Sequence, residues 1–302
     1  MDDNLLQPRK GRGAVSNLQG RFDPQTREDF DDGWDSGHDD GDEDFPGESG
    51  AANNPLQTQI TREIARSILT RNSSPDVPFS VSLNPYRGCE HGCIYCFARP
   101  SHSYLELSPG LDFETRLFAK VNAAELLRQE LAHPGYRPEP IALGVNTDAY
   151  QPCERTLRIT RAILEVLHEC EHPVALISKS ALLERDLDLL VPMAQKGLVS
   201  VTVTITTLDH GIARTLEPRA ASPTRRLKTV QRLSEAGVPV GVNVAPVIPF
   251  VTDHDLEAIL EAAAQAGAMG ASYIILRLPW EVSPLFREWL RAHYPDRAER
   301  VM

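Results

Sequence analysis

The chain has 302 residues, of which 41% are apolar and 24% are charged, values that are ordinary for a soluble globular protein. Its formal net charge is -11, but residues 1–50 hold fourteen acidic and five basic side chains, so the rest of the chain is nearly neutral. A nearly neutral domain lacks the basic excess of most nucleic-acid-binding proteins, so nucleic acid is a partner that the composition does not favour.

The N-terminus, the apolar runs and the cysteines together predict the cellular compartment of the protein. The charged N-terminus contains no apolar signal segment, and prolines and polar residues interrupt the longer apolar runs, so we expect no contact with a membrane. The chain has five cysteines, an odd number, which does not indicate a disulfide framework. These features predict a cytoplasmic protein.

Composition divides the chain into three parts. Residues 1–55 are rich in Asp, Gly and Asn, and we expect a disordered acidic tail because such a segment buries too little apolar surface to fold. In residues 56–78, isoleucines at helical spacing predict a lead-in helix followed by a loop. Residues 79–302 form the core domain. The chain stops in a helical pattern without a stop signal, which suggests a core that is incomplete at its C-terminal end.

Strand-like and helical patterns alternate through the core domain. The predicted strands lie near residues 79–84, 140–145, 174–178, 199–206, 239–245 and 272–278. The predicted helices lie near residues 122–132, 156–170, 182–195, 223–236, 253–266 and 284–294, with Asn122 and Ser222 as expected N-caps. This alternation predicts an α/β fold with a parallel sheet built by right-handed crossovers, which can curve into a barrel.

Three cysteines follow the first predicted strand in a single loop. Cys89, Cys93 and Cys96 have C-x3-C-x2-C spacing, and Gly88 and Gly92 permit a tight loop around a bound group. Thiolate sulfur is a soft ligand that suits iron-sulfur clusters, zinc or cuprous copper. A 4Fe-4S cluster is usually held by four cysteines, so three leave one iron open to an outside molecule.

The cysteine loop resembles the signature of the radical S-adenosylmethionine (SAM) superfamily, which also places an aromatic residue, here Tyr95, before the third cysteine. The resemblance implies a partial (β/α)6 TIM-like barrel in which these three cysteines hold a 4Fe-4S cluster. It further implies that SAM chelates the open iron and is reductively cleaved to a 5′-deoxyadenosyl radical. An electron donor such as flavodoxin or ferredoxin would supply the electron, and the reaction would be of lyase or oxidoreductase type on an unknown substrate.

Polar residues follow the predicted strands, at the edge of the sheet where ligands of such barrels gather. The resemblance implies that Tyr95 lies by the adenine and that Thr147, Asp148, Lys179 and Thr204 line the SAM site. Simpler roles remain open for two of them. Asp148 fits an Asx turn before the next helix, and threonine at position 204 is an ordinary strand residue.

The segments after the third and fourth strands resemble spore photoproduct lyase, a radical SAM enzyme that repairs a thymine dimer in DNA, and its uncharacterised relatives. The similarity rests on Ser178-Lys179 and Glu217-Pro218 as well as on the cysteine loop. Two departures count against dimer repair. Residues 145–148 contain no cysteine where the lyase has its hydrogen donor, and Phe97 replaces a tyrosine. DNA-lesion repair therefore remains an alternative function.

A third possibility is a binding module without chemistry. In this interpretation the three cysteines and a histidine, His91 or His102, hold a structural zinc ion. Structural zinc sites more often contain paired C-x2-C elements, and the chain has no second pair. The sequence therefore favours the iron-sulfur enzyme and identifies no catalytic residue beyond it.

Overall fold

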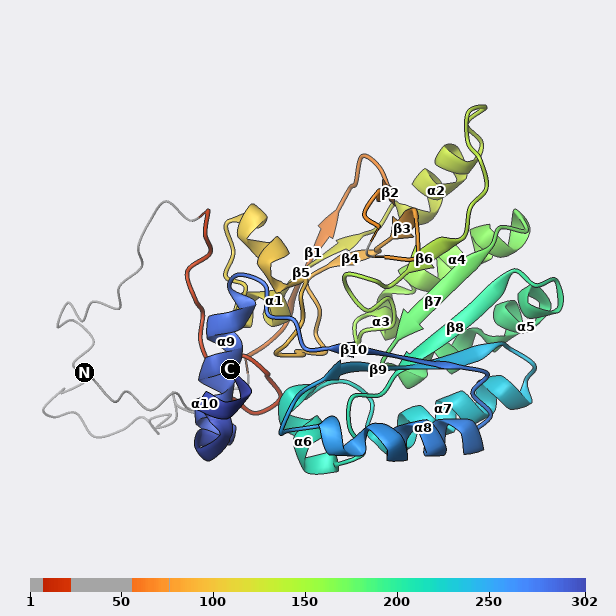
Figure 1. Ribbon diagram of the computed structural model, residues 1–302. Helices are drawn as coiled ribbons and strands as arrows, with labels where there is room; N and C mark the ends of the chain where they lie inside the picture. The colour runs from red at the N-terminus through yellow and green to blue at the C-terminus, as the bar shows by residue number, and fades with distance from the viewer. Residues whose placement is uncertain (1–7, 23–55, 76) are drawn as a thin grey trace, which may run out of the picture.

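The computed structural model describes residues 8–22, 56–75 and 77–302. Its main sheet has seven strands in the order β10-β9-β8-β7-β6-β3-β2 (Figure 1). The antiparallel edge strand is β2 (Leu69–Arg71). The other six are parallel: β3 (Val81–Leu83), β6 (Ile141–Leu143), β7 (Val174–Ser178), β8 (Val199–Thr204), β9 (Val240–Val247) and β10 (Ala271–Ile275). They coincide with the six predicted strands and confirm the partial TIM-like barrel.

Helices connect the parallel strands and cover one face of the sheet (Figure 1). The connecting helices are α2 (Ala123–Leu131), α3 (Glu154–Leu157), α4 (Ile159–Glu169), α5 (Leu187–Gln195), α6 (His210–Leu216), α7 (Pro223–Glu235) and α8 (Leu256–Gln265). The sequence analysis did not predict α6. The predicted helix at 156–170 is divided, because Arg158 adopts a left-handed conformation between α3 and α4.

The core lies between the helices and the sheet. Along β9 the valines at 240, 242 and 244 are buried while Gly241 and Asn243 between them are half-buried. This alternation follows from the two-residue period of a strand, which sends successive side chains to opposite faces. The helix-covered face is therefore the apolar core, and the opposite, concave face is left more open.

The predicted lead-in helix at 56–78 is wrong. Residues Gln59–Glu63 form β1, which pairs with β5 (Arg116–Lys120) in a small second sheet that also contains β4 (Tyr86–Arg87). Ile60 lies opposite Leu117, a partner more than fifty positions away. Tertiary pairing of this kind overrides the local helical spacing.

The expectation of a disordered tail over residues 1–55 is wrong for residues 8–22, and its other residues lie outside the described part of the chain. Residues 8–22 run between α1 (Leu111–Thr115) and α9 (Val282–His293) (Figure 1). Ala14 is fully buried in a second apolar cluster with Ile94 of the cysteine loop and Trp289 of α9. The Ser16 hydroxyl donates a hydrogen bond to Glu288. This segment is thus part of the wall behind the cysteine loop.

The two expected N-caps are confirmed in part, and glycines follow three of the helices. Gly197, Gly237 and Gly267 follow α5, α7 and α8 with φ of 68°, 77° and 89°, the left-handed values that suit glycine there. The Ser222 hydroxyl accepts a bond from Arg225 N and caps α7. Asn122 precedes α2 but does not cap it, because its side-chain amide instead exchanges two hydrogen bonds with the backbone of Ala65.

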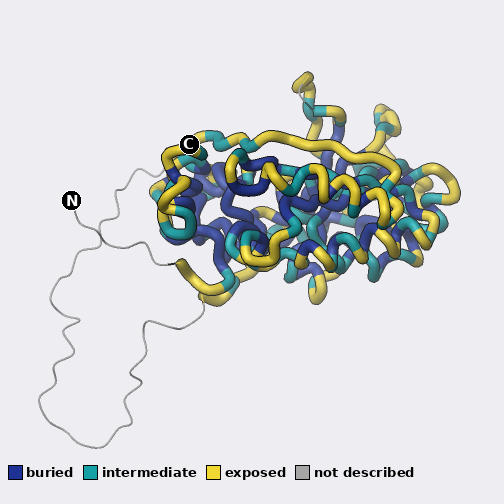
Figure 2. Tube along the Cα trace, turned by 60° about the horizontal axis from the view of Figure 1, so that its bottom comes forward, coloured by how far each residue is buried: buried dark blue, intermediate teal, exposed yellow. Residues whose placement is uncertain are grey.

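The strand at the other edge of the main sheet, β10, is exposed along its whole length (Figure 2). Beyond it, α9 folds back over the end of the sheet and is followed by the short α10 (Ala298–Val301). Among the described residues, no helix is both long enough and apolar enough to cross a membrane.

Candidate active site

The cysteine loop leaves the C-terminal end of β3 and is shaped by two glycines. Gly88 and Gly92 have φ of 74° and 68°, which other residues rarely adopt. A Cβ at Gly88 would lie 2.7 Å from Leu117, and one at Gly92 would lie 2.8 Å from Glu114, so neither position has room for a side chain. Backbone bonds from Gly92 N to Cys89 O and from Cys96 N to Cys93 O close two turns. These turns bring the three cysteines onto one small loop.

The three thiols lie close enough to influence one another. Cys89 and Cys93 are buried, and Cys96 is half-buried. Burial raises the pKa of Cys89, and the neighbouring Asp148, Cys93 and Cys96 raise it further. Burial likewise raises the pKa of Cys93 to about 12, although the charge of Lys179 opposes this. Cys89 and Cys93 are therefore protonated without a bound metal, and metal binding would release their protons.

The donor set fits an iron-sulfur cluster better than a single zinc ion. In the ranges that the structure describes, no three His, Cys, Asp or Glu side chains converge on one metal position. Tetrahedral zinc needs such convergence, whereas each cysteine of a 4Fe-4S cluster binds a different iron. The two histidines considered for zinc have other surroundings: His91 lies 3.3 Å from Asp148, and His102 bonds Arg116 O.

A buried ion pair holds the loop from behind. Arg99 is fully buried and donates to the carbonyls of Gly92 and Cys93, at 3.2 and 2.9 Å. Its guanidinium pairs with Glu114, whose carboxylate also accepts bonds from Gly13 N and Ala14 N at 3.0 and 2.9 Å. One ion pair therefore ties the cysteine loop, α1 and residues 8–22 together.

Two further segments bind the loop from the front. The end of α6 and the segment after it make two backbone hydrogen bonds to the cysteine loop. Ile94 N donates to Leu216 O at 3.1 Å, and Arg219 N donates to His91 O at 3.2 Å. The Gln151 side chain accepts from Glu90 N at 2.8 Å and donates to Gly88 O at 3.2 Å. The loop is thus fixed on several sides before any cofactor binds.

Tyr95 belongs to a buried polar network. Its hydroxyl donates to Glu217, which also accepts a bond of 2.8 Å from Thr206 and pairs with Arg226. Burial alone would raise the pKa of Glu217, but the charges of Arg226 and Lys179 hold it at about 2. Arg226 also donates to Thr204 O at 3.0 Å, which fixes the end of β8. The carboxylate therefore sets the position of the Tyr95 ring.

Lys179 is the cation of this site without a counter-ion. Its ammonium lies 5.8 Å from the centre of the Tyr95 ring, and no carboxylate in the described ranges approaches within ion-pair distance. Burial would lower the pKa of Lys179, but Cys93 and Glu217 raise it. A charged ammonium with no protein partner, beside the cysteine loop, suits an anionic group of a ligand.

The side chains of Asp148 and Thr147 are occupied by protein partners. Asp148 accepts bonds from Tyr150 N, Ser178 Oγ and Lys179 N at 2.7–2.8 Å. Burial would raise its pKa, but the charge of His91 and these bonds hold it at about 2. The Thr147 hydroxyl donates to Tyr86 O at 3.0 Å. Both side chains therefore join the loop after β6 to its neighbours.

The structure thus places Lys179 near Tyr95 of the cysteine loop and Asp148 near His91 and Cys89, while Thr204 is joined to this site only through Arg226. Sequence reasoning assigned no role to Arg99, Glu114 or Gln151. The first two are charged residues shortly after the third cysteine, but nothing in the sequence shows that they are buried.

Comparison with known proteins decides the family. The family model described as the radical SAM superfamily matches residues 83–263, which include all three loop cysteines. The chain belongs to the radical SAM superfamily. Enzymes of this superfamily use a 4Fe-4S cluster and SAM, the cofactors that the donor set fits.

The curated relatives carry no stated function. Uncharacterized proteins of Mycobacterium bovis and Mycobacterium tuberculosis are 39% identical over 226 residues, 74% of this chain and 66% of theirs. The chain therefore spans about two thirds of their length. An uncharacterized protein of Methanocaldococcus jannaschii is 24% identical over 72% of this chain and 78% of its own length.

Solved structures show the same fold. Spore photoproduct lyase complexed with dinucleoside spore photoproduct matches with a TM-score of 0.55 and 15% identity, over 78% of this chain and 66% of that one. A mutant of the lyase with bound AdoMet and the same photoproduct matches with a TM-score of 0.55 and 14% identity, over the same shares of the two chains. At this identity the similarity extends to the fold alone.

Proposed function

We propose that this protein is a radical SAM enzyme in which Cys89, Cys93 and Cys96 hold a 4Fe-4S cluster and leave one iron for SAM. The observation that carries the proposal is the arrangement of three mutually close thiols on a loop fixed from several sides. The other two cysteines lie elsewhere: Cys153 packs in the main core, and Cys170 is exposed after α4. The cluster and SAM together supply a 5′-deoxyadenosyl radical when an electron donor such as flavodoxin or ferredoxin reduces the cluster.

The chain's own residues position SAM in this proposal. The ammonium of Lys179 meets the carboxylate or a ribose oxygen, because it lacks a protein counter-ion. The Tyr95 ring, held by Glu217, lies by the adenine, and Thr204 borders the same space. Asp148 and Thr147 act on SAM through the backbone that they fix rather than through their side chains.

Lesion repair on DNA is the second candidate. The fold match to a lyase complexed with a dinucleoside photoproduct favours it. The nearly neutral domain, the exposed Phe97 in place of a tyrosine and the absence of a cysteine at 145–148 favour a different substrate. Repair predicts salt-dependent binding to damaged duplex, and a lack of binding at low salt would eliminate it.

Anaerobic purification with metal and product analysis tests the main proposal. The wild-type protein should contain about four irons and four sulfides per chain and should produce 5′-deoxyadenosine from SAM and dithionite. Cys93→Ala should lose both properties, whereas Cys170→Ala, an exposed cysteine outside the loop, should keep them. One zinc per chain and no 5′-deoxyadenosine would instead support the zinc-binding module.

A further inference from the structure

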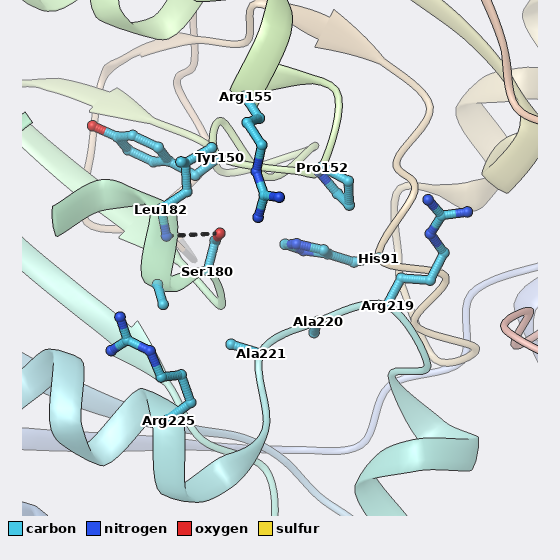
Figure 3. A pocket seen from close by; sticks show the side chains of 11 residues that line it. His91, Tyr150, Pro152, Arg155, Ser180, Leu182, Arg219, Ala220, Ala221 and Arg225 are labelled. Carbon is cyan, nitrogen blue, oxygen red and sulfur yellow. Dashed lines mark hydrogen bonds between the residues drawn. The ribbon is translucent and has the colours of Figure 1, made fainter. Parts of the chain in front are cut away.

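A pocket of about 390 Å³ opens beside the cysteine loop, among the segments that follow β6, β7 and β8 (Figure 3). The cysteine loop contributes His91, and helix α3, which follows β6, contributes Arg155. The turn after β7 contributes Ser180, and the segment beyond α6 contributes Arg219 and, at the start of α7, Arg225. The volume is within the range of small-molecule sites.

The lining of this pocket is positively charged. Its charge comes from three arginines, and the lining contains no aspartate or glutamate. In Figure 3 the guanidinium group of Arg155 and the imidazole of His91 both point toward the middle of the pocket. His91 is 2% exposed, so its imidazole offers little surface to the pocket and Arg155 is the main charged group that points into it. Such a surface favours an anion.

Two of the arginines are held in place by carboxylates outside the lining. Arg219 pairs with Glu90 at 3.1 Å, and Arg225 pairs with Glu184. Each of these pairs neutralises part of the charge but also fixes a guanidinium group at the pocket wall. The Arg155 side chain is exposed, and its guanidinium has no hydrogen bond or ion pair to any residue in the described ranges. Its charge is therefore available to a ligand.

The pocket is separate from the proposed SAM site. Lys179 and Tyr95 do not line it. The pocket and the cysteine loop share a part of the pocket lining, because Arg219 N donates a hydrogen bond to His91 O of the loop. A ligand in the pocket would thus contact the cysteine loop.

We propose that this pocket binds the phosphate group of a small phosphorylated molecule, with Arg155 as its main charged contact. Guanidinium groups match the oxygens of phosphate with paired hydrogen bonds, and three arginines line this pocket, of which Arg155 points into it. A small ligand fits better than a nucleic acid, since the domain as a whole lacks a basic excess. The inference goes beyond the proposed radical chemistry and does not rest on it.

Calorimetric titration of inorganic phosphate into the full-length, anaerobically purified protein at constant ionic strength tests the proposal. The wild-type protein should bind phosphate saturably. Arg155→Gln should weaken binding about tenfold or more, because one charge-assisted contact is lost. Arg214→Gln is the matched control: Arg214 is exposed on α6 and does not line the pocket, so its loss should change affinity less than about twofold.

Three outcomes would overturn the proposal. The first is a wild-type protein that gives no saturable heat with phosphate at millimolar concentrations. The second is an Arg155→Gln variant that binds as tightly as the wild type while melting at the same temperature. The third is binding of a short DNA duplex that depends on Arg155 and is not displaced by inorganic phosphate. This result would assign the pocket to nucleic acid.

Discussion

The ion pair between Arg99 and Glu114 gives the sharpest stability prediction. Both side chains are 0% exposed, and Glu114→Gln would leave the guanidinium of Arg99 buried without a counter-charge. Breaking a buried pair by removing one partner costs about 3–5 kcal/mol. The variant would also weaken the bonds that Gly13 N and Ala14 N make to the carboxylate, so residues 8–22 should loosen from the loop.

The matched control is Glu169→Gln, which makes the same substitution in an exposed pair. Arg128 and Glu169 are 50% and 53% exposed, and solvent screens such surface pairs, so the loss of this one should change stability far less than the loss of the buried pair. Urea unfolding of both variants in metal-free, reduced protein, followed by circular dichroism, gives the two free-energy changes without a contribution from the cluster. Proteolysis near Arg12 should also become faster in Glu114→Gln. Equal losses of stability in the two variants would show that the pair does not hold the loop.

Three other predictions concern the same site. Gly92→Ala should lower the iron content and should cost more stability than the control Gly197→Ala. Both glycines have φ of 68°, but only at Gly92 would the new Cβ meet a neighbour, Glu114, at 2.8 Å. Equal losses of stability in urea unfolding, together with an unchanged iron content, would contradict this prediction. Acid should destabilise the fold between about pH 4.5 and 2 because of Glu217, whose pKa is lowered from its ordinary value of 4.5 to about 2. Its carboxylate stabilises the folded state fully above pH 4.5 and loses that effect as the pH falls toward 2. The slope of unfolding free energy against pH should therefore be smaller in Glu217→Gln, and an unchanged slope would refute the assignment. Lys179→Met should weaken SAM binding about tenfold or more in equilibrium dialysis, because the ammonium forms no ion pair within the described ranges and is available to SAM; tight SAM binding by this variant would exclude the proposed role.

The main sheet could be predicted because its strands carry a strong local signal. The runs at β7, β8 and β9 are rich in β-branched residues, and a glycine follows each of the helices α5 and α7 between them. The type of these elements and their order along the chain could therefore be predicted from the sequence. The segment at β1 was not readable, because its structure depends on pairing with β5 and two of its outward side chains, Ile60 and Ile64, remain exposed. Local spacing cannot show a partner so distant in sequence.

Residues 8–22 were missed for a related reason. Composition predicts disorder when few apolar side chains are available, but this segment is held mainly by polar contacts: two backbone amides bond Glu114, and Arg12 donates to Glu114 O. The cysteine loop itself was predictable because its spacing is local. The residues that fix it, Arg99 and Gln151, could not be found from sequence, since their roles depend on burial against segments that are brought together only by folding.

Mössbauer spectroscopy of the iron-57 protein, recorded with and without SAM, tests most directly whether three cysteines leave one iron open. The account predicts that SAM changes the signal of about one quarter of the iron while the other three quarters stay as they were. A spectrum in which SAM alters no iron site, or in which the protein alone already supplies a fourth ligand, would contradict it.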